Sequence, residues 1–502
     1  MRLQIALSVT SAALAAGNPL AKRAAIDDCL KAANVPVDAK GSTDWNNDVR
    51  AFNQRLQYTP AAIAVARTTE HVAAAVSCAA KVGVKVNAKS GGHSYASFGL
   101  GGENGHLVVQ LDRMNKVTVD SSTKIATVEA GSRLGHVATV LYNNGRRAFS
   151  HGTCPGCVFW PCVGVAGHSL HGGFGFSSHT HGLAVDWIVG ATVVLANSTV
   201  VEASDTVNRD LFWALKGSGS NFGIVTHFKF KTFEAPSQVT KFDINLNWGS
   251  GQQIAQGWQA MQDWVLSGGM PKEMNMRVFG NGMQTQIQGL YHGNSNALRT
   301  AIQPLLSRIG GSLASAQQYD WMGAFSYYTY GNGNVDITHP YSQTETFYSK
   351  SMVTNTLSST TMRAVGDYWV NTARRNNRQW FIIIDFYGGK NSAITNMPGN
   401  ATSYPYRDEY VWLFELYDRV GSGSYPSNGF GFLDGWVKAF TDNHKGANDL
   451  WGMYINYADP ALSRTEAENV YFRKNLPKLQ QLKAQYDPTD VFYYPQAVSP
   501  KP

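Results

Sequence analysis

Two glycine-rich stretches constrain this chain more strongly than any other feature of its sequence. The first, Lys89 to Gly99, follows an apolar run at 82–86 that is typical of a buried strand. The second comprises residues 151–156 and 164–175. Because glycine leaves backbone N–H groups uncovered, such loops can approach a phosphate closely. A single Gly-Gly-His loop is more often a surface turn, but two such loops can hold one large ligand.

The N-terminus has the pattern of a secreted precursor. Met1-Arg2 and the mostly apolar residues 3–16 are typical of a secretory signal, and Lys22-Arg23 is a dibasic processing site. We therefore expect residues 1–23 to be a signal and propeptide, and the mature protein to be secreted and extracellular. The chain has 502 residues in all, enough for two or three domains.

The charge of the mature chain excludes some classes of partner. Removing Arg2, Lys22 and Arg23 lowers the formal net charge from +7 to 7 − 3 = +4, which is too small and scattered an excess for nucleic-acid binding. No other run approaches the roughly 18 apolar residues that a membrane helix needs. We expect a monomer without a metal ion. The sequons at Asn197 and Asn400 predict glycosylation.

Five cysteines suit the oxidising compartment that the leader implies. Cys29 lies in a short amphipathic stretch, and Cys78 lies in an alanine-rich helix that we predict over 70–80, with Thr69 as its N-cap and Gly83 at its end. We predict a disulfide between these two cysteines. The remaining three are an odd number, so at least one is free or serves another purpose: Cys154, Cys157 and Cys162.

The order of the predicted elements indicates an α+β protein of two domains. A strand at 61–66, the helix and a strand at 84–88 form a βαβ unit that leads into the first glycine-rich loop. Helices and strands alternate up to about residue 236, so we assign 24–236 to a first domain. Residues 237–447 contain long strand-like runs and are predicted to form a large antiparallel sheet with helices on one side. Residues 448–502 return to mixed character and are expected to complete the first domain.

The densest aromatic stretch of the chain is 319–330. It has two interpretations. It is either a packed loop that covers the sheet or a stacking platform, since sugar rings present apolar C–H faces to aromatic side chains.

Four separated stretches together support a resemblance: residues 90–94; 151–155 with 164–175; 211–223; and 454–457 with 486–488. In this order, across almost the whole mature chain, they resemble the fungal FAD-linked oxidases of the berberine-bridge-enzyme-like group in the vanillyl-alcohol-oxidase superfamily. The similarity is greatest to the members that oxidise glucooligosaccharides. The resemblance implies an FAD-binding domain made from both ends of the chain around a central substrate domain.

The resemblance also implies a flavin held by two covalent bonds. His93 matches the histidine that bonds to the flavin 8α-methyl, and Cys154 matches the cysteine that bonds to C6. Imidazole and thiolate are the side chains most able to attack an electron-poor isoalloxazine. The same match implies further cofactor-binding residues: Ser90, Gly91, Gly92, Ser94, Gly152, Val163, Gly167, Gly172, Gly173, Ile224 and Tyr493.

The chain departs from the family pattern at one place. Six residues, 157–162, intervene before Val163 and bring two extra thiols into the loop. Either Cys154 still forms the second bond, or Cys157 or Cys162 replaces it, or the bond is lost; we favour Cys154. Val163 matches a small valine that leaves oxygen access to the flavin, which favours an oxidase over a dehydrogenase.

For the chemistry, the resemblance implies Tyr457 as the general base and Asp385 as its partner. Removing hydride from the anomeric carbon of a sugar requires a base for the C1 hydroxyl proton. A buried tyrosine with a satisfied hydroxyl is the simpler interpretation of Tyr457. Asp385 lies in the apolar run 381–386, where an unpartnered carboxylate is costly, so we expect a partner for it. Tyr95, Tyr330 and Phe381 are expected to line the substrate groove.

The predicted function is therefore oxidation of the C1 hydroxyl of reducing-end glucose in oligosaccharides to the lactone, with O2 reduced to H2O2. Two alternatives remain open. The same scaffold oxidises alkaloids, polyketides and aromatic alcohols, and a protein whose insertion displaces the flavin would bind carbohydrate without turnover.

Overall fold

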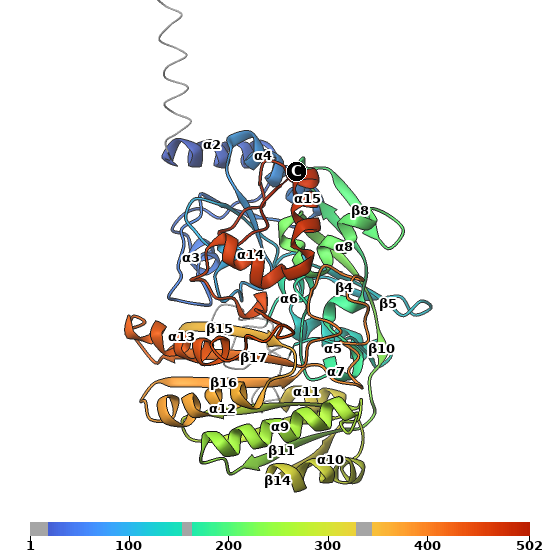
Figure 1. The fold of residues 1–502 in the computed structure, drawn as a ribbon. Helices are drawn as coiled ribbons and strands as arrows, with labels where there is room; N and C mark the ends of the chain where they lie inside the picture. The colour runs from blue at the N-terminus through green and yellow to red at the C-terminus, as the bar shows by residue number, and fades with distance from the viewer. Residues whose placement is uncertain (1–18, 153–162, 328–343, 502) are drawn as a thin grey trace, which may run out of the picture.

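The computed structural model describes residues 19–152, 163–327 and 344–501 (Figure 1). Residues 1–18, which belong to the predicted signal and propeptide of 1–23, lie outside these ranges, as do the predicted site residues Cys154 and Tyr330 and the cysteines Cys157 and Cys162. Within them, no helix is long and apolar enough to span a bilayer. The same part of the chain contains no group of three His, Cys, Asp or Glu side chains placed to hold a metal ion.

The first glycine-rich loop leaves the end of a small parallel sheet. Its strands β1 (Ala62–Val65), β3 (Leu107–Gln110) and β2 (Val86–Lys89) lie in the order β1-β3-β2. Helix α4 (Thr69–Val82) connects β1 to β2, so the predicted βαβ unit is confirmed. Gly83 ends α4 with φ 71°, as predicted, but the N-cap is Thr68, whose hydroxyl accepts a hydrogen bond from His71 N–H, and not Thr69.

Cys29 and Cys78 form the predicted disulfide. It joins α2 (Pro19–Ala32) to α4, and both helices pack on the small parallel sheet. The bond therefore fixes the N-terminal helix to the main body of the protein.

A second, antiparallel sheet has the order β4-β5-β9-β7-β8. Its strands are β4 (Val117–Val119), β5 (Ile125–Glu129), β9 (Ile224–Lys231), β7 (Ile188–Val194) and β8 (Val200–Ser204). Strands β4 and β5 form one hairpin, β7 and β8 form another, and residues 184–187 form a 3-10 turn before β7. The helices beside it are α5 (Leu134–Asn143), α6 (Val165–Leu170) and α8 (Arg209–Ser218).

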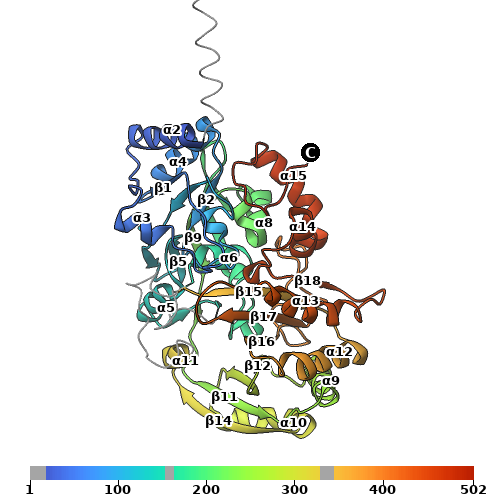
Figure 2. The same ribbon diagram turned by 90° about the vertical axis from the view of Figure 1, so that its left-hand side faces the viewer.

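The two ends of the chain share one hydrophobic core. Ala467 and Phe472 on α14 (Arg464–Phe472) and Leu479 on α15 (Leu476–Tyr486) belong to the same buried cluster as Ile26 and Val86. Both ribbon views show α15 close to α8 (Figures 1 and 2). A bipartite α+β unit is therefore formed from the N- and C-terminal regions.

The central region forms one eight-stranded antiparallel sheet in the order β14-β11-β13-β12-β16-β17-β15-β18. Its strands are β11 (Val239–Leu246), β12 (Met274–Asn281), β13 (Thr285–Tyr291), β14 (Gly311–Tyr319), β15 (Thr346–Thr354), β16 (Gln379–Phe386), β17 (Trp412–Val420) and β18 (Trp451–Gly452). Strand β18 lies within 448–502, so that segment also contributes an edge strand to this sheet. The α+β two-domain fold class is confirmed.

Alternation along the strands separates the two faces of this sheet. On β16, Trp380, Ile382 and Ile384 pack in the core beneath helices α9 (Gly251–Ser267), α10 (Ser295–Ile309), α12 (Ser359–Tyr368) and α13 (Asn428–Thr441). Phe381 and Asp385 occupy the alternate positions and face away from these helices. The strand pattern thus places an aromatic ring and a carboxylate on the face opposite these helices.

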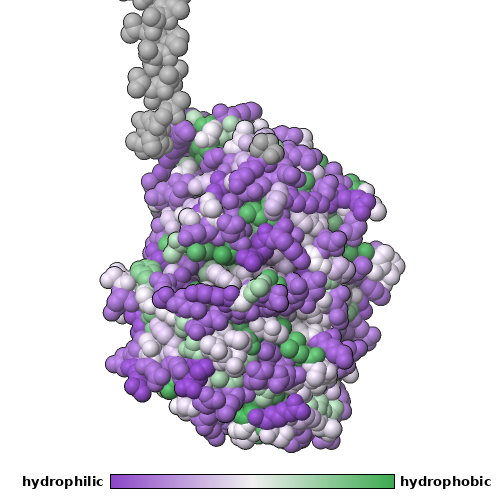
Figure 3. Space-filling model, in the orientation of Figure 1, coloured by the Kyte–Doolittle hydropathy of each residue, from purple (hydrophilic) through white to green (hydrophobic). Residues whose placement is uncertain are grey.

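The aromatic stretch begins as helix α11 (Trp321–Tyr327). Trp321 and Ala324 pack in a small buried cluster with Phe176 and Leu290. For these residues the packing interpretation is correct. On the face seen in Figure 3, hydrophobic residues are scattered among hydrophilic ones over the described part of the chain.

Candidate active site

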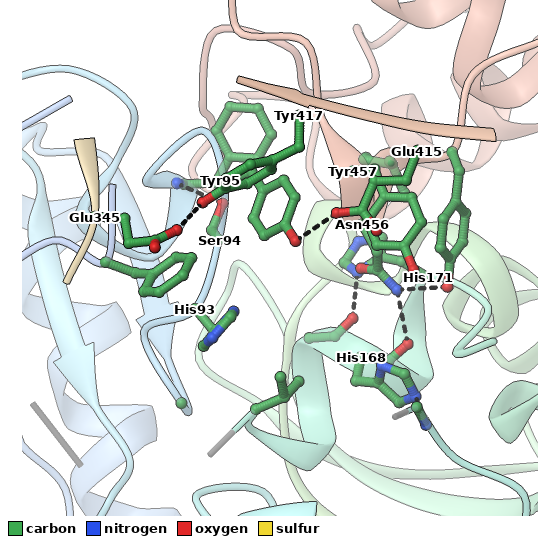
Figure 4. Close-up of a pocket in the computed structure, with 18 of the residues that line it drawn as sticks. His93, Ser94, Tyr95, His168, His171, Glu345, Glu415, Tyr417, Asn456 and Tyr457 are labelled. Carbon is green, nitrogen blue, oxygen red and sulfur yellow. Dashed lines mark hydrogen bonds between the residues drawn. The ribbon is translucent and has the colours of Figure 1, made fainter. Parts of the chain in front are cut away.

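A cavity of about 1500 Å³ lies where the glycine-rich loops meet the face of the large sheet opposite its helices. This exceeds the usual range for small-molecule sites, roughly 300–1000 Å³. Figure 4 shows side chains from both units pointing toward this space, including His93, Tyr95, Glu415 and Tyr457. The cavity can therefore hold a large cofactor and a second molecule together.

The two glycine-rich loops touch backbone to backbone. A Cβ atom at Gly91 would lie 2.2 Å from Gly164 N, and one at Gly164 would lie 2.2 Å from Gly91 N. The Arg133 guanidinium donates to Gly91 O at 2.6 Å and holds this arrangement. At Gly167, which lines the cavity, an added Cβ would meet no heavy atom within 4 Å. The loops therefore form one continuous wall that only glycine permits at the point of contact.

His93 lies at the centre of this wall. Its ring stacks on Phe52 with centroids 3.9 Å apart, and its buried Nε2 has no hydrogen-bond partner among the described residues. Burial, with a smaller contribution from the Arg133 charge, lowers the pKa of His93 to about 3. The imidazole is therefore neutral at ordinary pH and keeps the nitrogen lone pair that nucleophilic attack requires. The glycine wall and this histidine fit the flavin that the sequence resemblance implies.

Tyr457 belongs to an aromatic and acidic cluster that lines the same cavity as His93. It ends the 3-10 turn η5 (Ile455–Tyr457), and its ring stacks on Tyr95 at 5.8 Å between centroids. Tyr95 donates its hydroxyl hydrogen to Glu415 Oε1 at 2.9 Å. A tyrosine from the first loop thus links the expected base to a buried carboxylate.

Two buried acids on the large sheet have raised pKa values. Burial raises the pKa of Asp385 to about 8, with the Arg277 charge opposing the shift and the Glu415 charge adding to it. Burial likewise raises the pKa of Glu415 to about 7, against the Tyr95 hydrogen bond and Arg277. The register places Arg277 opposite Asp385 across β12 and β16, so this guanidinium is the positive charge that acts on Asp385.

Glu415 is a site residue that the sequence analysis missed. It lies in the apolar run 411–416, the same signal that drew attention to Asp385, since a carboxylate in a buried strand needs a partner. Glu415 and Arg277 line the cavity, whereas Asp385 does not.

Most of the predicted cofactor residues line the cavity: Ser90, Gly91, Gly92, His93, Ser94, Gly152, Val163, Gly167 and Ile224. Gly172 and Gly173 do not; both have positive φ, and Gly173 N–H donates to the Tyr454 hydroxyl at 2.8 Å, so they shape the loop behind the wall. The Tyr493 ring lies outside the cavity near Lys85 and Arg464, and its neighbour Tyr494 lines the cavity instead. The assignment of Tyr493 as a cofactor-binding residue stays a prediction.

The predicted substrate residues Tyr95 and Phe381 both line the cavity. Phe381 stacks on Tyr417 with centroids 4.6 Å apart, and Tyr417 stacks on Phe347 at 4.4 Å. The sequence analysis did not identify Tyr417, which meets Phe381 only through the pairing of β16 with β17. Phe381 and Tyr417 give the cavity an aromatic floor, and Phe347 lies buried beneath Tyr417.

Two family models match the chain. One for an FAD binding domain covers residues 60–204, and one described as berberine and berberine like covers residues 453–499. A xylooligosaccharide oxidase of Thermothelomyces thermophilus is 61% identical over 501 residues, or 99% of each chain. A carbohydrate oxidase of Microdochium nivale is 48% identical over 497 residues, or 97% of each chain.

Solved structures of carbohydrate oxidases also resemble this chain. The xylooligosaccharide oxidase from Myceliophthora thermophila C1, in complex with xylobiose, superposes with a TM-score of 0.92 at 61% identity and covers 95% of this chain and 100% of that one. A glucooligosaccharide oxidase from Acremonium strictum with a 6-S-cysteinyl, 8α-N1-histidyl FAD has a TM-score of 0.89 at 42% identity, covering 95% of this chain and 99% of that one. The similarity therefore extends over the whole described fold.

Proposed function

Because the chain belongs to the berberine-bridge-enzyme-like FAD-linked oxidases and is an FAD-dependent carbohydrate oxidase, we propose that it oxidises the anomeric C1 hydroxyl of the reducing-end sugar of oligosaccharides to the lactone. The sugar is glucose, as the sequence predicts, or xylose, as the name of the 61% identical relative suggests. The observation that carries the proposal is the cluster of Tyr457, Tyr95 and Glu415 beside His93 in a single cavity. Bound FAD supplies the hydride acceptor, and O2 accepts the electrons and forms H2O2.

Tyr457 is proposed to take the C1 hydroxyl proton. A phenol with its reference pKa of about 10 is a weak base at neutral pH, so the proton needs a further acceptor. Asp385 is proposed to share this proton with the phenol, because burial raises its pKa to about 8, closer to that of a phenol than an ordinary carboxyl is. Only the ionised form of Asp385 accepts the proton, and the fraction of that form grows as the pH rises toward 8. Tyr95 holds the Tyr457 ring by stacking and is itself oriented by Glu415.

His93 and Cys154 are proposed to carry the two covalent flavin bonds. The bond to His93 is supported by its neutral imidazole, whose Nε2 has no hydrogen-bond partner among the described residues. Both bonds are supported by the 6-S-cysteinyl, 8α-N1-histidyl FAD of the Acremonium strictum oxidase. Cys154 remains the preferred thiol over Cys157 and Cys162. Acid denaturation followed by peptide mapping of the yellow peptides tests the assignment; flavin on another cysteine would contradict it.

Secretion and glycosylation are proposed as well. Asn197 lies in the turn between β7 and β8, and both it and Asn400 are exposed, which is where a glycan can be accepted. We retain 1–23 as the signal and propeptide, a monomeric mature protein, and the first domain as 24–236 with 448–502 around a substrate domain of 237–447.

An activity panel tests the proposed reaction. Peroxide release is measured with cellobiose, maltose, xylobiose and a set of aromatic alcohols, and anaerobic bleaching of the flavin is recorded for each. We expect peroxide and bleaching with the oligosaccharides. Bleaching by aromatic alcohols alone would assign the scaffold to that substrate class, and sugar binding without bleaching would identify a carbohydrate-binding flavoprotein.

A further inference from the structure

The cavity extends beyond the aromatic floor to the edge of the large sheet. Its outer lining includes the β12–β13 turn at 282–284, the segment 374–379 before β16, and Arg419 on β17. Gln379 lies at the outer end of β16, and Asp385 lies near its inner end. At about 3.3 Å per residue along a strand, the outer lining is therefore roughly 20 Å from the buried acids. The groove is therefore long enough for several linked sugar rings.

The chemical character of the floor changes along this length. On β17 the same-face residues are Glu415, Tyr417 and Arg419, in order from the inner end outward. From the inner to the outer end, the groove is therefore lined first by an acidic, then by an aromatic and then by a basic side chain. Near the outer end, Arg374 and Arg378 add two more guanidinium groups to the lining.

Two of the three outer arginines are neutralised by carboxylates. Arg378 pairs with Asp418, to which its Nε donates at 2.9 Å, and Arg419 pairs with Glu345. Their charges are balanced within the protein.

Arg374 differs from both. Its guanidinium donates to Trp248 O at 2.6 Å and to Thr285 Oγ1 at 2.7 Å, which are neutral acceptors, and it forms no salt bridge with a carboxylate of the described chain. Burial lowers its pKa, which reports partial loss of water around the cation. These two bonds use two of its five N–H donors. A partly desolvated cation with no carboxylate partner in the described part of the chain thus borders the outer groove.

From this arrangement we propose that the outer groove binds oligosaccharides that carry a uronic acid on the part of the chain remote from the oxidised end, with Arg374 binding the carboxylate. The inference rests on the proposed function, because it requires the reducing end to lie at the inner acids. A guanidinium binds a carboxylate through paired, charge-assisted hydrogen bonds. Asn376, Asn377 and Gln284 line the same region and supply amide groups for sugar hydroxyls.

The test compares two substrates in several proteins. The substrates are a neutral trisaccharide and the same backbone bearing a glucuronic acid on its non-reducing end, and the measurement is kcat/KM from peroxide release. In the wild type we expect the acidic substrate to be preferred. Arg374→Gln should lower the acidic-to-neutral ratio about tenfold, as expected for losing a hydrogen-bonded charge, while Arg374→Lys should retain part of the preference.

The neighbouring Arg375→Gln is the matched control. Arg375 is exposed and is not among the lining residues, so its replacement removes the same charge from the same segment without touching the groove. We expect an unchanged ratio. An equal ratio in wild type and Arg374→Gln, or an equal loss in Arg375→Gln, would overturn the proposal.

Two further measurements keep the outcome clear. In the wild type, added NaCl should reduce the preference for the acidic substrate, since salt screens a partly exposed charge pair; a ratio independent of salt would contradict a charge-based site. Calorimetric binding of the acidic and the neutral trisaccharide to the Tyr457→Phe protein distinguishes the proposed oxidation reaction from the proposed role of Arg374. Loss of peroxide with both substrates would refute the proposed function, whereas equal binding of acidic and neutral trisaccharides would refute only the role of Arg374.

Discussion

Asp385 makes the stability of this protein depend on pH in a direction opposite to that of most acids. An unfolded aspartate has a pKa of about 3.9, and burial raises the pKa of Asp385 to about 8 in the folded protein. Between these values the folded state holds a proton that the unfolded chain has released. The contribution of Asp385 is therefore complete below pH 4 and is lost as the pH rises through about 8.

Asp385→Asn removes this dependence, since an amide does not ionise. A shift of one pK unit corresponds to about 1.4 kcal/mol. Relative to its value below pH 4, the free energy of unfolding of the wild type should therefore be lower by about 1.5 kcal/mol at pH 5 and by about 5 kcal/mol at pH 8 because of Asp385. The stability of the variant relative to the wild type should therefore increase by roughly 4 kcal/mol over this range.

The assay is urea-induced unfolding of the flavin-containing protein at pH 5, 6, 7 and 8, followed by tryptophan fluorescence. Asp263→Asn is the control, because Asp263 lies exposed on α9 and the change is chemically identical. We expect the urea midpoints of wild type and Asp263→Asn to fall together as the pH rises, and that of Asp385→Asn to fall less. Parallel midpoints for all three proteins would refute the argument that Asp385 is buried and protonated.

Three further predictions concern the site and the disulfide. Tyr457→Phe should keep the bound flavin while anaerobic reduction by sugar, measured by stopped-flow bleaching, slows roughly 10²–10⁴-fold, the range for losing a general base; near-normal reduction would exclude Tyr457. His93→Ala should retain flavin through Cys154 after acid denaturation but oxidise sugar more slowly, and complete loss of flavin would show that no second bond exists. Replacing Cys29 and Cys78 by serine should destabilise the protein by about 4 kcal/mol in chemical denaturation, given their separation of 49 residues. An unchanged denaturation midpoint would show that the disulfide does not restrict the unfolded chain.

Local patterns in the sequence were sufficient for several features. Gly83 ends α4 because a residue with positive φ is needed there, and glycine adopts it without a clash. The β4–β5 and β7–β8 hairpins likewise follow from turn residues that lie close together in the sequence, whereas the Cys29–Cys78 bond, predicted from the two helical stretches that carry these cysteines, joins positions 49 residues apart. His93 and Tyr457 were identified through short stretches that resemble a known family, and the structure places both at one cavity.

Other residues could be assigned only after the chain had folded. The role of Glu415 depends on Tyr95, which comes from a loop of the other structural unit and is 320 residues away in the sequence. Tyr493 and Tyr494 are adjacent in the sequence, and only the direction of the backbone decides which ring enters the cavity.

The sequence by itself determined many of the helices and strands, the disulfide and the family to which the chain belongs. Helices and strands follow from periodicity and capping, and the family follows from short stretches of sequence; all of these can be recognised without knowing the fold. The tertiary structure decided which charges meet and how far each is removed from water. Strand register placed Arg277 beside Asp385, and burial, which no local pattern measures, raised the pKa of Asp385 and left Arg374 partly desolvated without a described counter-charge. Electrostatic energies depend on the distance and the surroundings of both partners, and those are properties of the folded chain.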